Sequence, residues 1–276
     1  LGVFEVALGG GEPTLHPNFI EILKFARKCG IIPNLATNGA ELSAKNILGI
    51  ARYAGAVALS VEFIGDEFEK RRGFAFETWL KSYKKLKRVG VRVVFQLTVS
   101  QANIADLPKI IDYLYQLQPY GIIFLTFKPY GRGLNFDAPL STVDLKVVQD
   151  TLRQSISDSD SEINIGYDCC LGNGLVGLGL QGDEQIKGCS AMRSSLAINA
   201  NLDVVPCSFT AQPVGNLEHN TIKDIWLNQA ATDWRNRFVE KIQLDHLCSS
   251  CKYNINCLGG CPEFKLVKCY KEKSPC

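Results

Sequence analysis

Residues 3–13 read VFEVALGGGEP, and this stretch decides the fold class. An apolar, β-branched run leads directly into three glycines, an acid and a proline. The pattern predicts a strand that ends in a tight turn, with Pro13 fixing the backbone where the next helix begins. The glycines would expose backbone polar groups, and Glu12 would offer a carboxylate to an ammonium group. Taken alone, the motif could be no more than a turn.

The pattern of short apolar runs and amphipathic helices continues to about residue 130. Strands are predicted at 3–8, 31–36, 56–61, 91–99 and 122–127, and helices at 19–29, 43–53, 79–89 and 107–117. Such alternation implies parallel strands joined by crossover helices. Periodicity alone leaves open a doubly wound sheet or part of a β/α barrel. One further helix is predicted at 141–157, residues 172–182 are glycine-rich and predicted to be flexible, and few long elements are expected after residue 187.

Composition narrows the function classes. The chain has 276 residues, 46% hydrophobic and 21% charged, and a formal net charge of +2. This balance does not favour an electrostatic grip on nucleic acid or a membrane surface. No apolar run approaches the roughly 20 residues of a membrane span, and no secretory signal is visible. The 11 cysteines are odd in number and concentrate in the last quarter, which favours metal or cluster ligation in a reducing cytoplasm over disulfides.

Four cysteines form the densest group. Cys248, Cys251, Cys257 and Cys261 follow one another with two, five and three intervening residues, and two glycines precede the last of them. Thiolates at such short spacing can converge on one metal centre, and glycines let backbone N–H groups approach cluster sulfides. A tetrahedral zinc site uses the same four ligands. The quartet alone therefore leaves zinc and iron–sulfur open.

The surroundings of the quartet resemble the SPASM domain, a holder of auxiliary [4Fe–4S] clusters, over residues 188–276. Gly188-Cys189 is followed by DVVPC at 203–207, GNL at 215–217 and IKDIW at 222–226. Leu202 departs from the family, which usually has glycine there, and we expect an altered turn. The resemblance implies a first cluster held by Cys189, Cys207 and Cys261, and a second held by Cys248, Cys251, Cys257 and Cys276. Cys169 or Cys170 is a possible fourth ligand of the first cluster, and Cys269 is a possible extra ligand.

Polar residues also recur at the ends of the predicted strands. Two successive strands end in Thr37-Asn38-Gly39 and Ser60-Val61-Glu62, and Thr98 and Asn103 flank the end of the next strand. Arg72 is placed in a connecting loop. The carboxyl ends of parallel strands meet at one mouth, where α/β folds bind ligands. Together with GGEP, this series resembles the radical S-adenosylmethionine (SAM) core over residues 1–130. The resemblance implies SAM contacts from Gly10, Gly11, Glu12, Thr37, Asn38, Ser60 and Glu62.

These resemblances imply a partial (β/α)6 TIM-like barrel followed by a small, cysteine-rich α+β domain. We expect a radical SAM core at 1–135, a linker and helix at 136–185, and a SPASM domain at 186–276. The family's CxxxCxxC loop, which binds the SAM-cleaving cluster, is absent from this sequence. We expect it upstream in a longer protein, and we expect this polypeptide alone not to cleave SAM.

The family chemistry is reductive cleavage of SAM to a 5′-deoxyadenosyl radical that abstracts a substrate hydrogen. We expect a peptide or protein substrate, an electron donor such as flavodoxin or ferredoxin, and a cytoplasmic location, with no nucleic-acid or membrane partner. No catalytic residue can be assigned. The alternatives are a non-catalytic scaffold or binding subunit and a zinc-stabilised interaction module. Cys29 falls on an apolar helix face and is predicted to be a core residue.

Overall fold

The computed structural model describes residues 2–136, 139–157, 163–176, 179 and 186–264. The chain divides into two compact units. The first comprises Leu1–Leu125 with Thr151–Gly166, and the second comprises Thr126–Asp150 with Tyr167–Cys276. Each unit is described by itself below.

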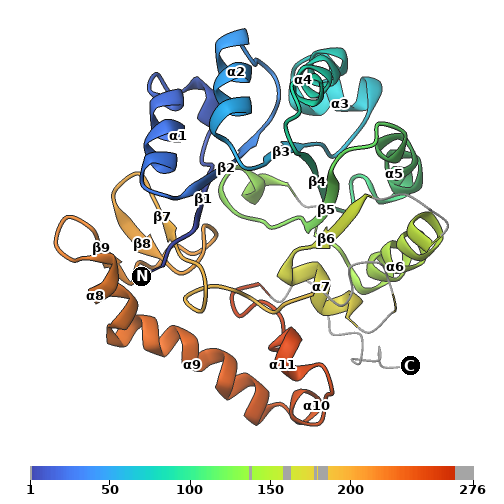
Figure 1. Ribbon diagram of the computed structural model, residues 1–276. Coiled ribbons are helices and arrows are strands. Elements are labelled where there is room, and N and C mark those ends of the chain that lie inside the picture. Colours follow the sequence, from blue (N-terminus) through green and yellow to red (C-terminus); the bar gives the residue numbers. More distant parts are fainter. Residues whose placement is uncertain (1, 137–138, 158–162, 177–178, 180–185, 265–276) are drawn as a thin grey trace. The chain divides into compact units, whose positions relative to one another are not determined.

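The first unit is built on one sheet whose strands lie side by side in chain order (Figure 1). The strands are β1 (Glu5–Leu8), β2 (Ile32–Thr37), β3 (Val57–Ser60), β4 (Val93–Val99), β5 (Gly121–Thr126) and β6 (Asn164–Tyr167). Strands β1 to β4 pair in parallel. A doubly wound sheet reverses its strand order at a switch point, whereas a β/α barrel adds each strand beside the last. The unbroken order therefore confirms the partial barrel.

Helices cover the outer side of this sheet (Figure 1). They are α1 (Phe19–Lys28), α2 (Ala44–Tyr53), α3 (Gly65–Arg72), α4 (Phe76–Arg88) and α5 (Leu107–Gln116), with short 3-10 turns at Pro13–Leu15 and Ile104–Asp106. The apolar stripe of α4 buries Trp79 and Tyr83 completely or nearly so, and the Trp79 ring lies 5.2 Å from that of Phe95 on β4. Aromatic burial of this kind is the largest single apolar contribution to a core.

Two predictions for the first unit were wrong. Helix α1 ends at Lys28, and Cys29 is its exposed C-cap, not a core residue. The apolar pattern continues to Cys29, but Gly30 adopts a left-handed φ of +75° and turns the chain toward β2. Arg72, predicted to lie in a loop, is the last residue of α3.

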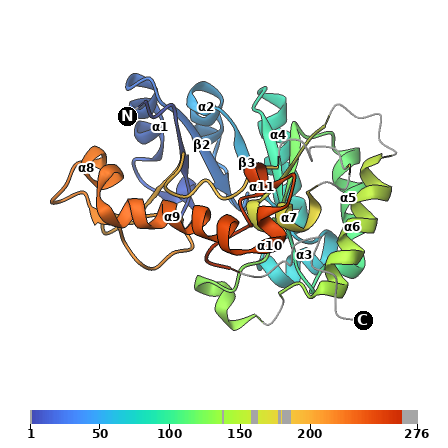
Figure 2. The same ribbon diagram turned by 90° about the horizontal axis from the view of Figure 1, so that it is seen from below.

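The second unit combines short helices with a small antiparallel sheet. The sheet contains β7 (Ala197–Ile198), β8 (Asp203–Val205) and β9 (Gly215–Asn216). The helices are α6 (Thr142–Ser157, shared between the units), α7 (Cys169–Leu175), α8 (Ile222–Leu227), α9 (Gln229–Leu244), α10 (His246–Ser249) and α11 (Asn254–Cys257), with a 3-10 turn at Gly131–Asn135. Figure 2 shows α9 leading from α8 to α10. Its Trp234 and Phe238 pack with Met192 and Cys189 in one apolar cluster.

The second unit is more regular than predicted. Residues 172–175 of the stretch expected to be flexible belong to α7, because Asp168 caps that helix and Gly172 lies where a Cβ would meet Ile186 at 2.9 Å. Residues 177–178 and 180–182 of that stretch lie outside the described ranges. Among the described residues after 187, the 16-residue helix α9 is the one long element, which agrees with the expectation of few long elements there.

The turn between β7 and β8 places Leu202 in the left-handed region, with φ of +61°. Its backbone N–H donates to the Asn199 carbonyl over 3.1 Å. A leucine therefore occupies a conformation that favours glycine, at a conformational cost of about 1–2 kcal/mol. Within the described ranges, no helix is both long and apolar enough to span a bilayer.

Candidate SAM and iron–sulfur cluster sites

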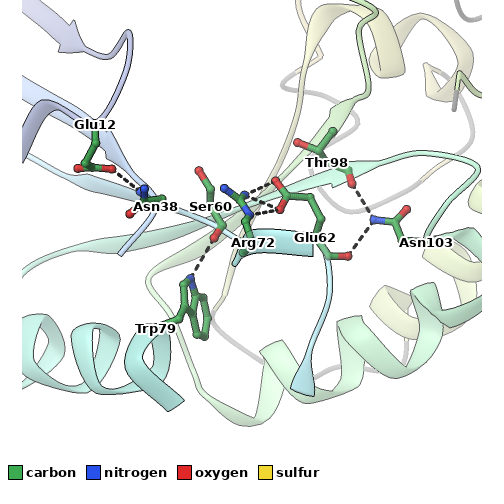
Figure 3. Close-up of polar contacts among 8 residues, drawn as sticks. All are labelled: Glu12, Asn38, Ser60, Glu62, Arg72, Trp79, Thr98 and Asn103. Atoms are coloured by element: carbon green, nitrogen blue, oxygen red, sulfur yellow. Dashed lines mark hydrogen bonds and ion pairs between the residues drawn. The ribbon is translucent and has the colours of Figure 1, made fainter. Parts of the chain in front are cut away.

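The carboxylate of Glu12 connects the glycine turn after β1 to the end of β2 through hydrogen bonds. Oε1 of Glu12 accepts hydrogen bonds from the Thr14 hydroxyl at 2.6 Å and the Thr37 hydroxyl at 2.7 Å. Oε2 accepts from the backbone N–H of Asn38 at 2.8 Å (Figure 3). Hydrogen bonds to an ionised acceptor are the stronger kind. Both oxygens of this carboxylate position the turn, and its contact with a ligand's ammonium stays a prediction.

The turn itself keeps open space beside its backbone. Gly10 has φ of +110°, which a residue with a Cβ adopts only under strain. A Cβ built on Gly9, Gly10 or Gly11 would meet no atom within 4 Å. The backbone groups of this turn are therefore accessible to a ligand.

A second polar group lies at the ends of β3 and β4 (Figure 3). Arg72 donates through Nε to Glu62 Oε2 over 2.8 Å, and its Nη2 also bonds to the same carboxylate. Asn103, which is buried, donates to the backbone carbonyls of Glu62 at 2.9 Å and Thr98 at 2.8 Å. The side chain of Asn103 thus fixes both strand ends and holds the Glu62–Arg72 pair in place.

The backbone carbonyl of Ser60 is hydrogen-bonded to a residue of the core. The indole Nε1 of Trp79 donates to the Ser60 carbonyl over 3.0 Å (Figure 3). The structure therefore brings the predicted residues of β1 and β2 into direct contact and connects those of β3 and β4 through Asn103. Trp79 was predicted only as a helix residue, because a bond between residues 19 positions apart leaves no periodic signal.

The second unit gathers cysteines from four separate segments. The Cys169 thiol is hydrogen-bonded to the thiols of Cys170, Cys189 and Cys261. Cys207 lies close enough to Cys189 and Cys261 to interact electrostatically with both. The predicted ligands Cys189, Cys207 and Cys261 therefore lie together, and both candidate extra ligands at 169 and 170 join them.

The electrostatics of this group follow from its hydrogen bonds. Donation from Cys169 and Cys170 lowers the pKa of Cys261, and donation from Cys169 lowers the pKa of Cys189. The same contacts raise the pKa of Cys169. Burial raises the pKa of Cys207. Negative charge is thus stabilised on Cys261 and Cys189, as a positively charged iron centre requires of its ligands.

Backbone N–H groups point at these sulfurs. The N–H of Phe264 donates to Cys261 Sγ over 3.4 Å, and the N–H groups of Ala191 and Phe209 donate to Cys189 and Cys207. N–H···S bonds of this kind are one of the means by which proteins hold and tune iron–sulfur clusters. Converging thiols with backbone donors fit an iron–sulfur cluster.

The remaining members of the quartet lie on two short helices. Asp245 caps α10 by accepting from the N–H groups of Leu247 and Cys248, and the Cys251 N–H donates to the Cys248 carbonyl over 3.0 Å. Cys257 ends α11 and donates through its thiol to Asn173 Oδ1 over 3.0 Å. The predicted ligands Cys276 and Cys269 lie outside the described residues.

The described residues contain no set of three or more His, Cys, Asp or Glu side chains arranged to hold a single metal ion. Thiolates that bind a cluster need a different arrangement, because each ligates its own iron atom.

Sequence reasoning missed the polar residues that support the cysteines. Lys128 and Asp168 form an ion pair beside the thiols, and both side chains are about nine-tenths buried. Asn173 binds Cys257, and a Cβ on Gly260 would meet Asn173 at 2.8 Å. The one available signal was Asp168 itself, an acid directly before the Cys169-Cys170 doublet.

Comparison with known proteins identifies both units. The model of the radical SAM superfamily matches residues 1–114, and that of the SPASM iron–sulfur cluster-binding domain matches residues 189–252. An AdoMet-dependent heme synthase of Methanosarcina barkeri is 26% identical over 272 residues, which cover 91% of this chain and 75% of the relative. Mycofactocin maturase MftC of Mycobacterium tuberculosis is 24% identical over 274 residues, covering 94% and 66%.

Solved structures share the fold. Streptococcus suis SuiB bound to its precursor peptide SuiA has a TM-score of 0.72 at 19% identity. The likeness covers 93% of this chain and 61% of SuiB, so the chain spans less than two thirds of that protein. The radical SAM match includes the glycine turn with its strand ends, and the SPASM match includes Cys189, Cys207, Cys248 and Cys251. Residues 1–114 are therefore a radical SAM domain and residues 189–252 a SPASM iron–sulfur cluster-binding domain, and the cofactors of these domains are S-adenosyl-L-methionine and iron–sulfur clusters.

Proposed function

We propose that this chain supplies the SAM-binding and auxiliary-cluster domains of a radical SAM enzyme that modifies a peptide or protein. The observation that carries the proposal is the convergence of Cys169, Cys170, Cys189, Cys207 and Cys261 from four segments of one unit. SAM, when reductively cleaved, supplies a 5′-deoxyadenosyl radical that abstracts hydrogen from a substrate. We propose functional domains at 1–135, 136–185 and 186–276.

In the SAM site, the backbone of Gly10 and Gly11 would contact the methionine moiety of SAM. The Glu12 carboxylate, with Thr37 and the Asn38 N–H, would hold that turn in place. Ser60 and Glu62 would line the same mouth, with Glu62 acting mainly by orienting the Arg72 guanidinium. These roles place Glu12 and Glu62 as positioning residues.

For the first auxiliary cluster we propose Cys169, Cys189, Cys207 and Cys261 as ligands. Cys169 is preferred over Cys170 because it contacts both Cys189 and Cys261. The second cluster would take Cys248, Cys251, Cys257 and Cys276, with Cys269 as a spare thiol.

The ligand sets are tested by counting iron and sulfide in cysteine variants after anaerobic reconstitution. Cys169→Ala should lose iron or leave a cluster with altered spectra, and Cys170→Ala should retain all of it. Cys29→Ala, which removes an exposed thiol from the first unit, is the control and should match the parent protein. Full iron content in Cys189→Ala and Cys261→Ala would contradict the first ligand set.

The peptide substrate rests on what the relatives do. SuiB is bound to a precursor peptide, and the relatives include a mycofactocin maturase and a PqqA peptide cyclase. The test uses the full-length enzyme with SAM, dithionite and candidate precursor peptides. Peptide-dependent formation of 5′-deoxyadenosine, with a mass change in the peptide, is the expected result.

A second candidate substrate is a tetrapyrrole, because an AdoMet-dependent heme synthase and an Fe-coproporphyrin III synthase are also among the relatives. Formation of 5′-deoxyadenosine only with Fe-coproporphyrin III would favour it over a peptide. No formation with either would favour a non-catalytic scaffold. We also propose a flavodoxin or ferredoxin as electron donor and a reducing, cytoplasmic location.

A further inference from the structure

A buried cation lies beside the cysteine group of the second unit. Lys128 forms an ion pair with Asp168, and the two side chains are 10% and 13% exposed. Two buried charges are retained only where they satisfy each other and further polar groups. Asp168 also accepts from the backbone N–H groups of Thr126 at 3.2 Å and Leu171 at 2.7 Å. The pair is therefore rigidly built into the unit.

The pair is joined to both sides of the proposed first cluster site. On one side, Asp168 is the N-cap of α7 and directly precedes Cys169 and Cys170. On the other side, the Lys128 ammonium lies 5.0 Å from the centroid of the Phe209 ring, two residues beyond Cys207.

The Phe209 ring in turn meets the Phe264 ring edge-on at 6.3 Å, and the Phe264 N–H donates to Cys261 Sγ. The ammonium is thus linked by successive contacts to the segments that carry Cys169, Cys207 and Cys261. Because the side chains of Lys128 and Asp168 are both about nine-tenths buried, the charge is weakly screened.

The charged form of Lys128 is also favoured by its surroundings. Burial by itself lowers the pKa of Lys128, but the negative charges of Asp168 and Cys170 outweigh burial, and the pKa is raised. The ammonium form of the side chain is therefore favoured.

We propose that Lys128 is a positioning residue of the first auxiliary cluster that raises its reduction potential, and that Asp168 orients Lys128 and partly offsets its charge. The inference rests on the proposed function, since it requires a cluster at this site. One electron enters the cluster and takes it from [4Fe–4S]²⁺ to [4Fe–4S]⁺, with no bond made or broken and no proton taken up. A nearby cation favours the more negative, reduced form.

The effect should be measurable. At an effective dielectric of about 20, a unit charge within about 10 Å changes an equilibrium constant by about tenfold or more. For a one-electron couple, tenfold corresponds to about 59 mV. Lys128→Met should lower the midpoint potential by about this amount, whereas Asp168→Asn should raise it.

The opposite signs of the two expected shifts in midpoint potential distinguish an electrostatic effect from structural damage. Asn caps helices as well as Asp does, so Asp168→Asn keeps α7 capped while removing the negative charge. Lys128→Arg keeps the cation and should leave the potential near that of the parent protein. The matched control is Lys146→Met, because Lys146 pairs with Asp150 on the exposed face of α6 and carries the same charge.

The experiment is a potentiometric titration with dithionite, followed by electron paramagnetic resonance of the reconstituted protein. The signal of the first cluster is the one lost in Cys189→Ala.

We expect shifts of opposite sign in the midpoint potential of Lys128→Met and Asp168→Asn, and no shift in Lys146→Met. If the signal is present but neither variant shifts it, the inference is wrong while the cluster assignment stands. If no signal depends on Cys189, both the cluster assignment and the inference are wrong. If Lys128→Met fails to take up iron, the inference is tested with Asp168→Asn and Lys128→Arg. An unshifted or lowered midpoint potential in Asp168→Asn would then overturn it.

Discussion

Replacing Gly188 by alanine should damage the cysteine group without removing any ligand. Gly188 is buried directly before Cys189, and its N–H donates to the Asn256 carbonyl. A Cβ on Gly188 would lie 2.5 Å from the carbonyl oxygen of Cys257 and 2.7 Å from Cβ of Leu258. Atoms in contact prefer separations of about 3.5–4.0 Å, so one segment must move by roughly 1 Å. Because both neighbours are close to the main chain, the movement separates the segment of Cys189 from that of Cys257.

Overpacking of this kind typically costs about 1–3 kcal/mol. We expect Gly188→Ala to lower the free energy of unfolding of the second unit by that amount in urea titrations, and to reduce iron and sulfide after reconstitution. Gly166→Ala is the control, because its Cβ would meet Cγ1 of Ile123 at an ordinary van der Waals distance of 3.4 Å. A Gly188→Ala protein with the stability and iron content of the parent would refute the reasoning.

Three further predictions concern backbone strain, the glycine turn and pH. Leu202→Gly should be more stable than Leu202→Ala by about 1 kcal/mol in urea titrations, because φ is +61° there; the usual order, with alanine the more stable, would contradict this. Glu12→Gln should cost about 1–2 kcal/mol in thermal unfolding and weaken SAM binding measured by calorimetry, because the amide NH₂ would face the Asn38 N–H in one orientation and the Thr14 N–H in the other; unchanged affinity would count against the positioning role. Burial raises the pKa of Tyr83 from 10.0 to about 12, so its contribution to stability is complete below pH 10 and is lost as pH rises through about 12. Tyr83→Phe should flatten that alkaline decline, and an equally steep decline would contradict the assignment.

Much of the barrel could be predicted because its elements carry their own periodic signal. The stripe of Trp79, Tyr83 and Leu86 repeats every three to four residues and marks α4. Helix α3 was missed because Phe68 is its only buried residue and most of the others are charged. Strand β6 was missed because Asn164–Tyr167 is short and contains a glycine.

The cysteine ligands of the site could be predicted from the sequence, but the polar residues that position them could not. Ligands close in sequence, such as the cysteine quartet, can be recognised by their spacing. The Lys128–Asp168 pair joins positions 40 residues apart, and nothing local indicates such a contact. The role of Glu12 was also not visible, because its bonds to Thr37 and Asn38 form only when β1 and β2 pair.

The central claim is that the cysteines of this chain build iron–sulfur cluster sites. The most direct measurement is iron, labile sulfide and zinc per chain after anaerobic reconstitution. About eight irons and eight sulfides, the content of two [4Fe–4S] clusters, are predicted. Zinc near stoichiometry with little iron would contradict the account and leave a zinc-stabilised module.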